Sequence, residues 1–341
     1  MRPSSVLVYG RTGVDSAESH CVVALRSMGI AVGTFDPDTH PAWLAPLRRT
    51  WKSKRWVNPV VERVPGLHRG LESSLIAHVR RTRPDLVLIL SITDLSPECI
   101  AALRNESRVV GWYQDHVVNF GRHLFLLAPY HQLFFKDPYI VSKLRDGIGA
   151  TNVHFLPEAC EPTVHRPAEP SAEDRLNYEC DVLVYGNMYV YRVRLLERLL
   201  DQGFNIRLFG NSPPLWLKSP ARKLWQGRGI TGDEKGRAIA CAKIVLSSSH
   251  FGEVESANAR IFETAGIGGF QLADAPGVAT YFEPGREIAL FRGPEDLLAR
   301  IRHYLNAPSE RAAIAAAGRE RALRDHTFVM RLERMFEIVF A

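Results

Sequence analysis

Arg260 and Glu263 are the two residues of this sequence whose types and spacing best suit a nucleotide ligand. They fall near the start of a predicted helix, where free N–H groups and the positive end of the dipole favour an anion. Residues three apart share one helical face, so the arginine could bind a diphosphate while the carboxylate accepts two ribose hydroxyls. An ion pair between the two side chains on a solvated face explains the same spacing without any ligand. Asn258, just before them, is a further candidate ligand-binding residue.

A second candidate group, Asp115 and His116, directly follows a predicted strand at residues 109–113. In parallel sheets, ligands lie beyond the carboxyl ends of the strands. A carboxylate or imidazole placed there could contact a substrate or act as a general base. A histidine that only forms hydrogen bonds within a loop remains the alternative. His20, in contrast, lies in the middle of a predicted helix and is expected to be structural.

The elements that must position these residues fall into two similar halves, in which short apolar runs alternate with helical patterns. Asp15 is the expected N-cap of the first helix, because Glu18 follows it at capping-box spacing. Residues 161–177, with three prolines and no periodicity, are expected to link the halves. Strands are predicted at residues 6–9, 30–35, 86–91, 109–113, 131–136 and 153–156, and again at 181–185, 206–209, 244–247, 270–272 and 288–291.

Strands that alternate with helices predict parallel sheets covered on both faces. The fold class expected is therefore α/β, with two facing, doubly wound, Rossmann-like domains and a ligand in the cleft between them. We expect an N-terminal domain at residues 1–160, a linker at 161–180 and a C-terminal domain at 181–325. A terminal helix at 326–341 would cross back to the first domain.

Several segments resemble the spore-maturation CgeB-like glycosyltransferases, mostly within residues 109–330. The sequence NARIFETA at 258–265 is similar to that family, as are GGFQL at 268–272 and FEPGREI at 282–288. In the first half, FKDPY at 135–139 and LPEAC at 156–160 are also similar. Residues 247–255 depart from the pattern, because the family has an asparagine at the end of this strand.

The resemblance implies a glycosyltransferase of the two-domain GT-B type that moves a hexosyl or deoxyhexosyl group in bacterial glycan biosynthesis. The donor, a nucleotide-diphosphate sugar, would be bound mainly by the second domain, with no obligatory metal and no cofactor. Glu255 and Glu263 have the Glu-x7-Glu spacing of many retaining members of this fold, so Glu255 is a candidate catalytic residue. Arg192 resembles the family's arginine at the diphosphate, although a surface arginine explains it equally well. The acceptor, whether glycan, lipid-linked sugar, protein or small molecule, stays open.

Two glycine turns fit this interpretation, because glycine lets backbone approach a phosphate closely. Gly186 and Asn187 follow the first strand of the second domain. Gly10, Arg11 and Gly13 form the matching turn of the first domain, where they would face the acceptor or the transferred sugar. That turn lacks the third spaced glycine of a dinucleotide fingerprint.

The composition is that of a globular protein: 341 residues, 46% hydrophobic and 23% charged. We expect neither a transmembrane span nor a signal peptide, because the apolar runs are too short. The five scattered cysteines include no CxxC pair, which disfavours a disulfide framework or zinc site and fits a cytoplasmic protein. The net charge of +6 suits an anionic partner, but no nucleic-acid-binding signature accompanies it.

Residues 41–57 carry five basic residues and three tryptophans without an acid. This pattern suits an anionic membrane surface, such as the inner face of a membrane, or a lipid-linked acceptor. It also suits single-stranded nucleic acid, or a basic loop whose tryptophans pack inward. The basic residues are Arg48, Arg49, Lys52, Lys54 and Arg55, and the tryptophans are Trp43, Trp51 and Trp56.

Two other functions remain as alternatives. A nicotinamide-dependent oxidoreductase would use Asp36, 26 residues after Gly10, as its ribose-binding acid. The second alternative is a non-catalytic module that binds nucleotide sugars. Asp36 and Asp38 beside His40 could hold a divalent cation, but a turn around Pro37 explains this pattern as well.

Overall fold

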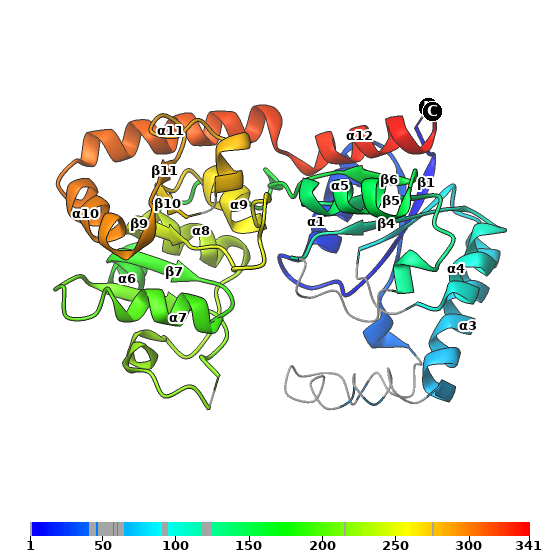
Figure 1. The fold of residues 1–341 in the computed structure, drawn as a ribbon, viewed down its shortest axis with the longest axis horizontal. Helices are drawn as coiled ribbons and strands as arrows, with labels where there is room; N and C mark the ends of the chain where they lie inside the picture. The colour runs from blue at the N-terminus through cyan, green and yellow to red at the C-terminus, as the bar shows by residue number, and fades with distance from the viewer. Residues whose placement is uncertain are drawn as a thin grey trace. The chain divides into compact units, whose positions relative to one another are not determined.

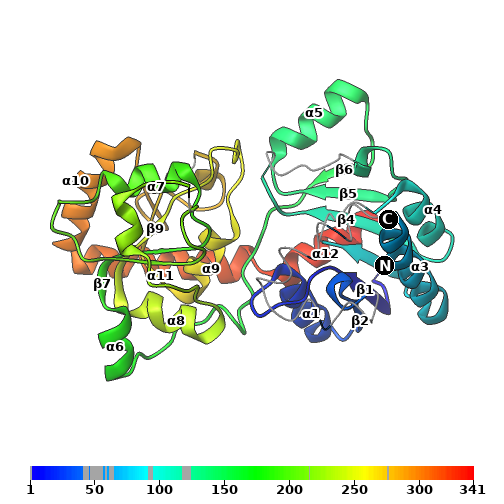
Figure 2. The same cartoon turned by 90° about the horizontal axis from the view of Figure 1, so that it is seen from below.

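The computed structural model describes residues 2–40, 46, 57, 60, 65–90, 95–116, 124–214, 216–274 and 276–341. The chain separates into two compact units (Figures 1 and 2). Unit 1 comprises Met1–Leu156 and Val329–Ala341, and unit 2 comprises Pro157–Phe328. The predicted basic, tryptophan-containing segment at 41–57 lies outside the described residues except for Pro46 and Val57.

Unit 1 contains a six-stranded parallel sheet with the strand order β2-β1-β3-β4-β5-β6. Its strands are β1 (Ser5–Tyr9), β2 (Ala31–Phe35), β3 (Leu86–Ile89), β4 (Arg108–Tyr113), β5 (Gln132–Phe135) and β6 (Val153–Phe155). The helices between them are α1 (Ala17–Ser27), α3 (Pro65–Thr82), α4 (Pro97–Arg104) and α5 (Pro138–Ile148), with short 3-10 helices η1 (Pro37–Thr39) and η4 (Leu124–Leu126). The order reverses direction between β1 and β3, as in doubly wound folds.

Unit 2 contains a five-stranded parallel sheet with the order β11-β10-β9-β7-β8. Its strands are β7 (Cys180–Tyr185), β8 (Ile206–Phe209), β9 (Ala242–Ser247), β10 (Gln271–Ala273) and β11 (Ala289–Leu290). Its helices are α6 (Ala172–Tyr178), α7 (Val190–Glu197), α8 (Gly232–Cys241), α9 (Ala259–Ile267), α10 (Gly293–Leu305) and α11 (Pro308–Asp325), with η5 (Pro220–Leu224) and η6 (Pro276–Thr280). Here the switch point lies between β7 and β9.

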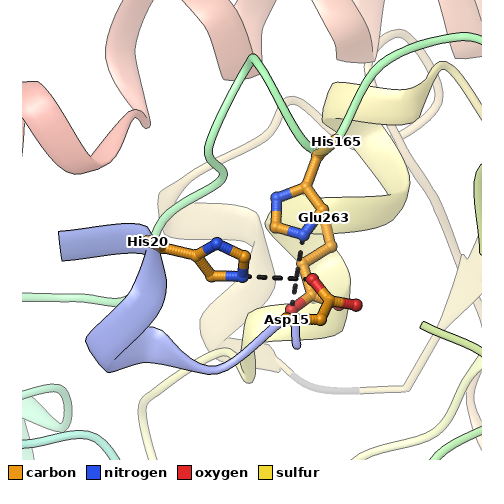
Figure 3. Close-up of side chains that lie close together, drawn as sticks. All are labelled: Asp15, His20, His165 and Glu263. Carbon is orange, nitrogen blue, oxygen red and sulfur yellow. Dashed lines mark ion pairs between the residues drawn. The ribbon is translucent and has the colours of Figure 1, made fainter. Parts of the chain in front are cut away.

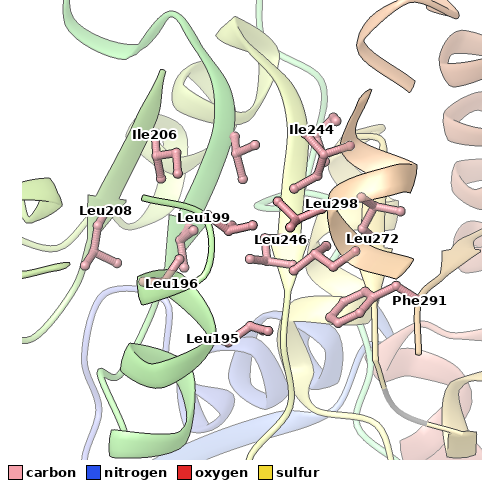
Figure 4. Packing of buried hydrophobic residues seen from close by; sticks show 14 of the residues in the cluster. Leu195, Leu196, Leu199, Ile206, Leu208, Ile244, Leu246, Leu272, Phe291 and Leu298 are labelled. Atoms are coloured by element: carbon pink, nitrogen blue, oxygen red, sulfur yellow. The ribbon is translucent and has the colours of Figure 1, made fainter. Parts of the chain in front are cut away.

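The core of unit 2 shows why its strands read as apolar runs in the sequence. Leu196 on α7 and Leu298 on α10 pack with Leu208, Leu246 and other side chains of the central strands (Figure 4). Strands buried on both faces cannot alternate polar and apolar residues, so the sequence predicts them as short hydrophobic segments.

The last helix, α12 (Phe328–Val339), packs with unit 1, and Figures 1 and 2 show it in red beside the strands of that unit. The Arg2 guanidinium donates to the Glu333 carboxylate at 2.5 Å, and the Arg108 guanidinium lies 5.0 Å from the Phe340 ring centroid. In unit 2, α11 packs against α9.

The structure differs from the sequence predictions in two local details. Ser16 is the N-cap of α1, and its hydroxyl accepts from the Ser19 N–H at 3.2 Å, whereas Asp15 adopts a left-handed conformation with φ of 68°. The expected linker at residues 161–180 contains α6 and the first residue of β7, and it clusters with unit 2. A serine hydroxyl caps a helix as well as a carboxylate does, so residue type could not separate the two adjacent candidates.

All five cysteines are among the described residues, and none of them forms a disulfide. Across the described ranges, the helices are each too short or too polar to pass through a lipid bilayer.

Candidate functional site

The candidate site in unit 2 lies where the strand order reverses, between the carboxyl ends of β7 and β9. Gly186 and Asn187 follow β7, and Ser248 and Ser249 follow β9. Doubly wound sheets bind their ligands at this position because the loops diverge there and leave a crevice.

Arg192, on α7, forms hydrogen bonds with both of these loops. Its side chain is 1% exposed, and its Nε donates to the Ser248 hydroxyl at 2.9 Å while Nη2 donates to the Ser248 carbonyl at 2.7 Å. Nη1 donates to the Asn187 carbonyl. Burial lowers the pKa of this guanidinium well below its usual range, and the charge of Arg260 lowers it further. The surface position considered for Arg192 is therefore wrong.

Arg260, in the first turn of α9, also contacts the loop after β9. Its Nη2 donates to the Ser248 carbonyl at 3.2 Å, so two guanidinium groups share one acceptor. Its Nε is buried and has no hydrogen-bond partner among the described residues. Gly186, with φ of 105°, leaves space for this side chain, because a Cβ there would lie 2.7 Å from Arg260 Nη1.

Asn258 is the N-cap of α9, but its side chain does not cap the helix. The residue is 8% exposed, and neither atom of its amide group has a hydrogen-bond partner within the described ranges. A buried amide without a partner costs free energy, and a ligand that accepts from Nδ2 or donates to Oδ1 would remove that cost. The N-terminus of α9 adds free N–H groups and a positive dipole end beside it.

Glu263 lies on α9 one turn beyond Arg260, but the two side chains do not form an ion pair. Glu263 is 9% exposed, and its Oε2 accepts from Lys235 Nζ at 2.9 Å. His165 Nε2 lies 3.9 Å from the other oxygen, Oε1 (Figure 3). The alternative of an Arg260–Glu263 pair on a solvated face is therefore wrong, because α8 supplies the cation that Glu263 contacts.

Glu255 and Asn187 are more exposed. Glu255 lies in the loop before α9. The backbone of this loop packs closely against Gly277, because a Cβ on Gly277 would lie 2.4 Å from the Glu255 carbonyl oxygen. The Asn187 carboxamide accepts from Asn211 Nδ2 at 2.6 Å and donates to the Tyr189 hydroxyl at 3.3 Å. Both residues are exposed to solvent, and the Asn187 carbonyl contacts Arg192.

A pocket of about 620 Å³ lies next to this site, at the carboxyl ends of β10 and β11. Asp274, Leu290 and Arg292 are among the residues that line it. Asp274 Oδ1 accepts from the Ser249 N–H at 2.7 Å, which connects the pocket to the loop after β9. Burial raises the pKa of the Asp274 carboxyl above its usual value.

In unit 1, the predicted glycine turn follows β1. A Cβ on Gly10 would lie 2.5 Å from Glu18 Oε1, so this position requires glycine, whereas nothing lies within 4 Å of a Cβ on Gly13. Arg11 Nε donates to Asp38 Oδ1 at 3.3 Å. The turn is thus held by contacts within unit 1 itself.

Asp115 and His116 follow β4 as predicted, but their geometry is not that of an aligned dyad. Asp115 Oδ1 accepts from the backbone N–H of His116 at 2.8 Å and lies 3.7 Å from His116 Nε2. The Asp115 side chain is 51% exposed and that of His116 is 4% exposed. Burial, and then the Asp115 charge, raise the pKa of the neighbouring Tyr113.

Two further residues considered from the sequence have structural contacts in unit 1. His20 Nε2 lies 3.1 Å from Asp15 Oδ1 (Figure 3). Asp36 Oδ1 accepts from the Asp38 N–H at 2.8 Å as the N-cap of η1, and Oδ2 accepts from the Thr12 hydroxyl at 3.0 Å. The turn around Pro37 that explains the Asp-x-Asp pattern is confirmed.

Sequence reasoning missed four residues of the unit 2 site: Ser248, Lys235, His165 and Asp274. Ser248 and Asp274 follow predicted strands, so the rule that placed Gly186 at a carboxyl end could have found them. Lys235 and His165 have no such signal, because they contact Glu263 from distant segments.

Comparison with known sequences confirms the resemblance to CgeB. Residues 192–337 match the family described as "Glycosyl transferase-like". Spore protein CgeB of Bacillus subtilis (strain 168) is 26% identical over 200 residues, which cover 53% of this chain and 59% of CgeB. The chain therefore matches less than two thirds of the length of this relative.

Comparison with solved structures confirms the GT-B fold. Sucrose-phosphate synthase from Thermosynechococcus elongatus is 13% identical, with a TM-score of 0.69 and coverage of 98% of both chains. A glycosyltransferase from Rickettsia africae is 11% identical, with a TM-score of 0.68 over 99% of this chain and 98% of its own. HepE from Anabaena, solved in complex with UDP and glucose, is 12% identical, with a TM-score of 0.64 over 99% of both chains.

Proposed function

Residues 192–337 of this chain match the glycosyl transferase-like family, and from that premise we propose that the protein transfers a sugar from a nucleotide-diphosphate sugar to an acceptor. The site in unit 2 would hold the donor. HepE, of the same fold, was solved with UDP and glucose, which supports a donor of this class.

The observation that carries the proposal is the convergence of Arg192 and Arg260 on the Ser248 carbonyl. Two like charges held together at the switch point of a sheet repel each other. A diphosphate offsets that repulsion and can accept hydrogen bonds from Arg260, Asn258 and the first N–H groups of α9. Glu263, one helical turn further on, would then accept the ribose hydroxyls.

Catalysis in this proposal consists of positioning and of electrostatic stabilisation of the departing diphosphate. Arg260 and the N-terminus of α9 face the negative charge that develops as the glycosidic bond breaks, while buried Arg192 fixes the Ser248 loop. The Glu-x7-Glu spacing of Glu255 and Glu263 favours retention at the anomeric carbon. No metal and no cofactor take part in the proposed reaction.

The acceptor would be bound by unit 1, through the turn at Gly10, Arg11 and Gly13 and through Asp115 and His116. The basic, tryptophan-containing segment at residues 41–57, most of it outside the described residues, would contact an anionic membrane surface. Sedimentation with anionic and with neutral vesicles tests this contact, and equal binding to both, or to neither, would contradict it.

A thermal-shift screen with UDP, GDP, ADP, dTDP and NADH tests the donor proposal directly. A ligand at 100 times its Kd adds about 2.7 kcal/mol of stability. We expect a nucleoside diphosphate to raise the Tm and NADH to leave it unchanged. Arg260→Ala and Glu263→Ala should each weaken nucleotide binding roughly 10- to 150-fold, because each removes a hydrogen bond of a charged group.

Transfer or hydrolysis of a radiolabelled nucleotide sugar distinguishes an enzyme from a non-catalytic binding module. A shift with NADH alone would favour the oxidoreductase instead. Asp36 caps η1 and accepts from the Thr12 hydroxyl, contacts that favour a structural role for this residue.

A further inference from the structure

Lys235 is a buried cation that no step of the proposed reaction uses. It lies on α8, is 3% exposed, and its Nζ donates to Glu263 Oε2 at 2.9 Å. Its Nζ also lies 6.0 Å from the centroid of the Tyr185 ring on β7. Thr264 directly follows Glu263 in the chain, and its hydroxyl lies 2.8 Å from the Tyr185 hydroxyl. The lysine is therefore enclosed by β7 and α9 on the side of the carboxylate.

His165 adds a second polar group on the same carboxylate. Its Nδ1 accepts the backbone N–H of Glu161 at 2.9 Å, which leaves Nε2 as the ring nitrogen near Glu263. Nε2 lies 3.9 Å from Glu263 Oε1 and 3.3 Å from Lys235 Nζ. The hydrogen bond to Glu263 Oε2 is shorter, at 2.9 Å, so Lys235 is the group that contacts the carboxylate directly and His165 borders it at a longer distance.

The position of Glu263 relative to Arg260 suits a nucleotide that runs along α9. Three residues of an α-helix advance about 4.5 Å, which is comparable to the separation between a diphosphate and its ribose. Hydrogen bonds from two neighbouring hydroxyls to one carboxylate need a defined orientation of its plane, and the ammonium 2.9 Å from Oε2 restricts that orientation.

We propose that Lys235 is a positioning residue that holds Glu263 in a fixed orientation as the acceptor of both ribose hydroxyls, so that the site selects ribonucleotides over 2′-deoxyribonucleotides. This inference rests on the proposed function and narrows its donor to a ribonucleoside-diphosphate sugar. A 2′-deoxy donor leaves one carboxylate oxygen without its hydroxyl, and we expect it to bind roughly tenfold or more weakly.

The test compares the Kd of UDP, GDP and ADP with those of their 2′-deoxy forms, together with inorganic pyrophosphate, by calorimetry on the full chain. We expect the wild type to prefer the ribonucleotide about tenfold or more. Lys235→Met and Glu263→Gln should reduce that preference to about twofold or less, with pyrophosphate affinity unchanged. Lys235→Arg, which keeps a cation, should restore part of it.

Lys243→Met is the matched control, because Lys243 also forms an ion pair, with Asp181 at 2.8 Å, but on the exposed surface of β9. It should leave the ribose preference unchanged. A wild type that binds ribo- and deoxyribonucleotides equally would overturn the inference even if Lys235→Met does not fold. Equal losses for UDP and pyrophosphate in a folded Lys235→Met would also overturn it, since they indicate a structural role alone. If no nucleotide binds the wild type, the proposed function itself fails.

Discussion

The Arg192 guanidinium donates to both the hydroxyl and the carbonyl of Ser248, at 2.9 and 2.7 Å. This forked contact ties α7 to the loop after β9 and therefore connects the two strands that border the switch point. The Arg192 side chain is fully buried. Arg260 donates to the same carbonyl, but its side chain is only half-buried. The two arginines thus have different expected roles.

We expect Arg192→Ala to lower the free energy of unfolding by about 3–5 kcal/mol, because it removes a large buried side chain and leaves the buried Ser248 hydroxyl without this donor. Arg192→Lys should recover only part of this, since an ammonium cannot form the fork. Chemical denaturation measures both changes. Arg194→Ala, on the same helix but exposed and paired with Glu197, should cost less than about 1 kcal/mol. A similarly small effect of Arg192→Ala would show that the forked contact does not stabilise unit 2.

Gly186→Ala should weaken nucleotide binding, because the new Cβ would lie 2.7 Å from Arg260 Nη1 and displace that side chain. The residue also has a φ of 105°, which adds a backbone cost of about 1 kcal/mol. Gly203→Ala separates the two effects, since Gly203 has a φ of 79° with nothing within 4 Å of a Cβ. Calorimetry should show a lower affinity in Gly186→Ala alone, and an equal loss in both variants would contradict this account.

The stability of unit 1 should depend on pH through Asp85, at the start of its sheet. Hydrogen bonds from the Ser4 hydroxyl and from the backbone N–H groups of Ser4 and Ser5 lower the pKa of this carboxyl from 3.8. An acid with a lowered pKa contributes stability above its unfolded value and loses it as the pH falls through the folded value. Asp85→Asn should therefore lower the Tm at pH 7.

The difference in Tm between wild type and Asp85→Asn should shrink as the pH falls below about 3.8. Asp146→Asn, an exposed acid of α5, serves as the control and should change the Tm little at either pH. A constant difference across this range would mean that Asp85 acts through something other than its charge.

Much of the unit 2 site could be predicted from local sequence. Gly186, Asn258 and Arg260 each lie next to a strand end or a helix start that hydrophobic periodicity locates. Because all strands of a doubly wound sheet end at one edge, residues at strand ends are brought together by topology alone. The same argument placed Asp115 and His116 after β4.

Contacts between distant segments could not be predicted in this way. Glu263 contacts Lys235, 28 residues away, and Arg192 contacts Ser248, 56 residues away. The packing of α8 and α7 against the sheet decides both contacts, and neither helix has a local spacing that signals them. The spacing of Arg260 and Glu263 instead suggested an ion pair that tertiary packing replaces with the Lys235 contact.

Asp115→Asn and His116→Ala should lower the transfer rate while nucleotide affinity stays near that of the wild type, because both residues belong to unit 1 and the proposed donor site belongs to unit 2. A positioned acid or base contributes typically 10²–10⁴-fold, or about 3–5 kcal/mol of barrier. The 51% exposed Asp115 carboxylate can reach a ligand directly, whereas the His116 side chain is 4% exposed. If Asp115 is the base, Asp115→Asn should lower kcat more than His116→Ala does. Unchanged rates in both variants would remove the pair from the mechanism, and a joint collapse of rate and affinity would make them donor ligands or determinants of the fold.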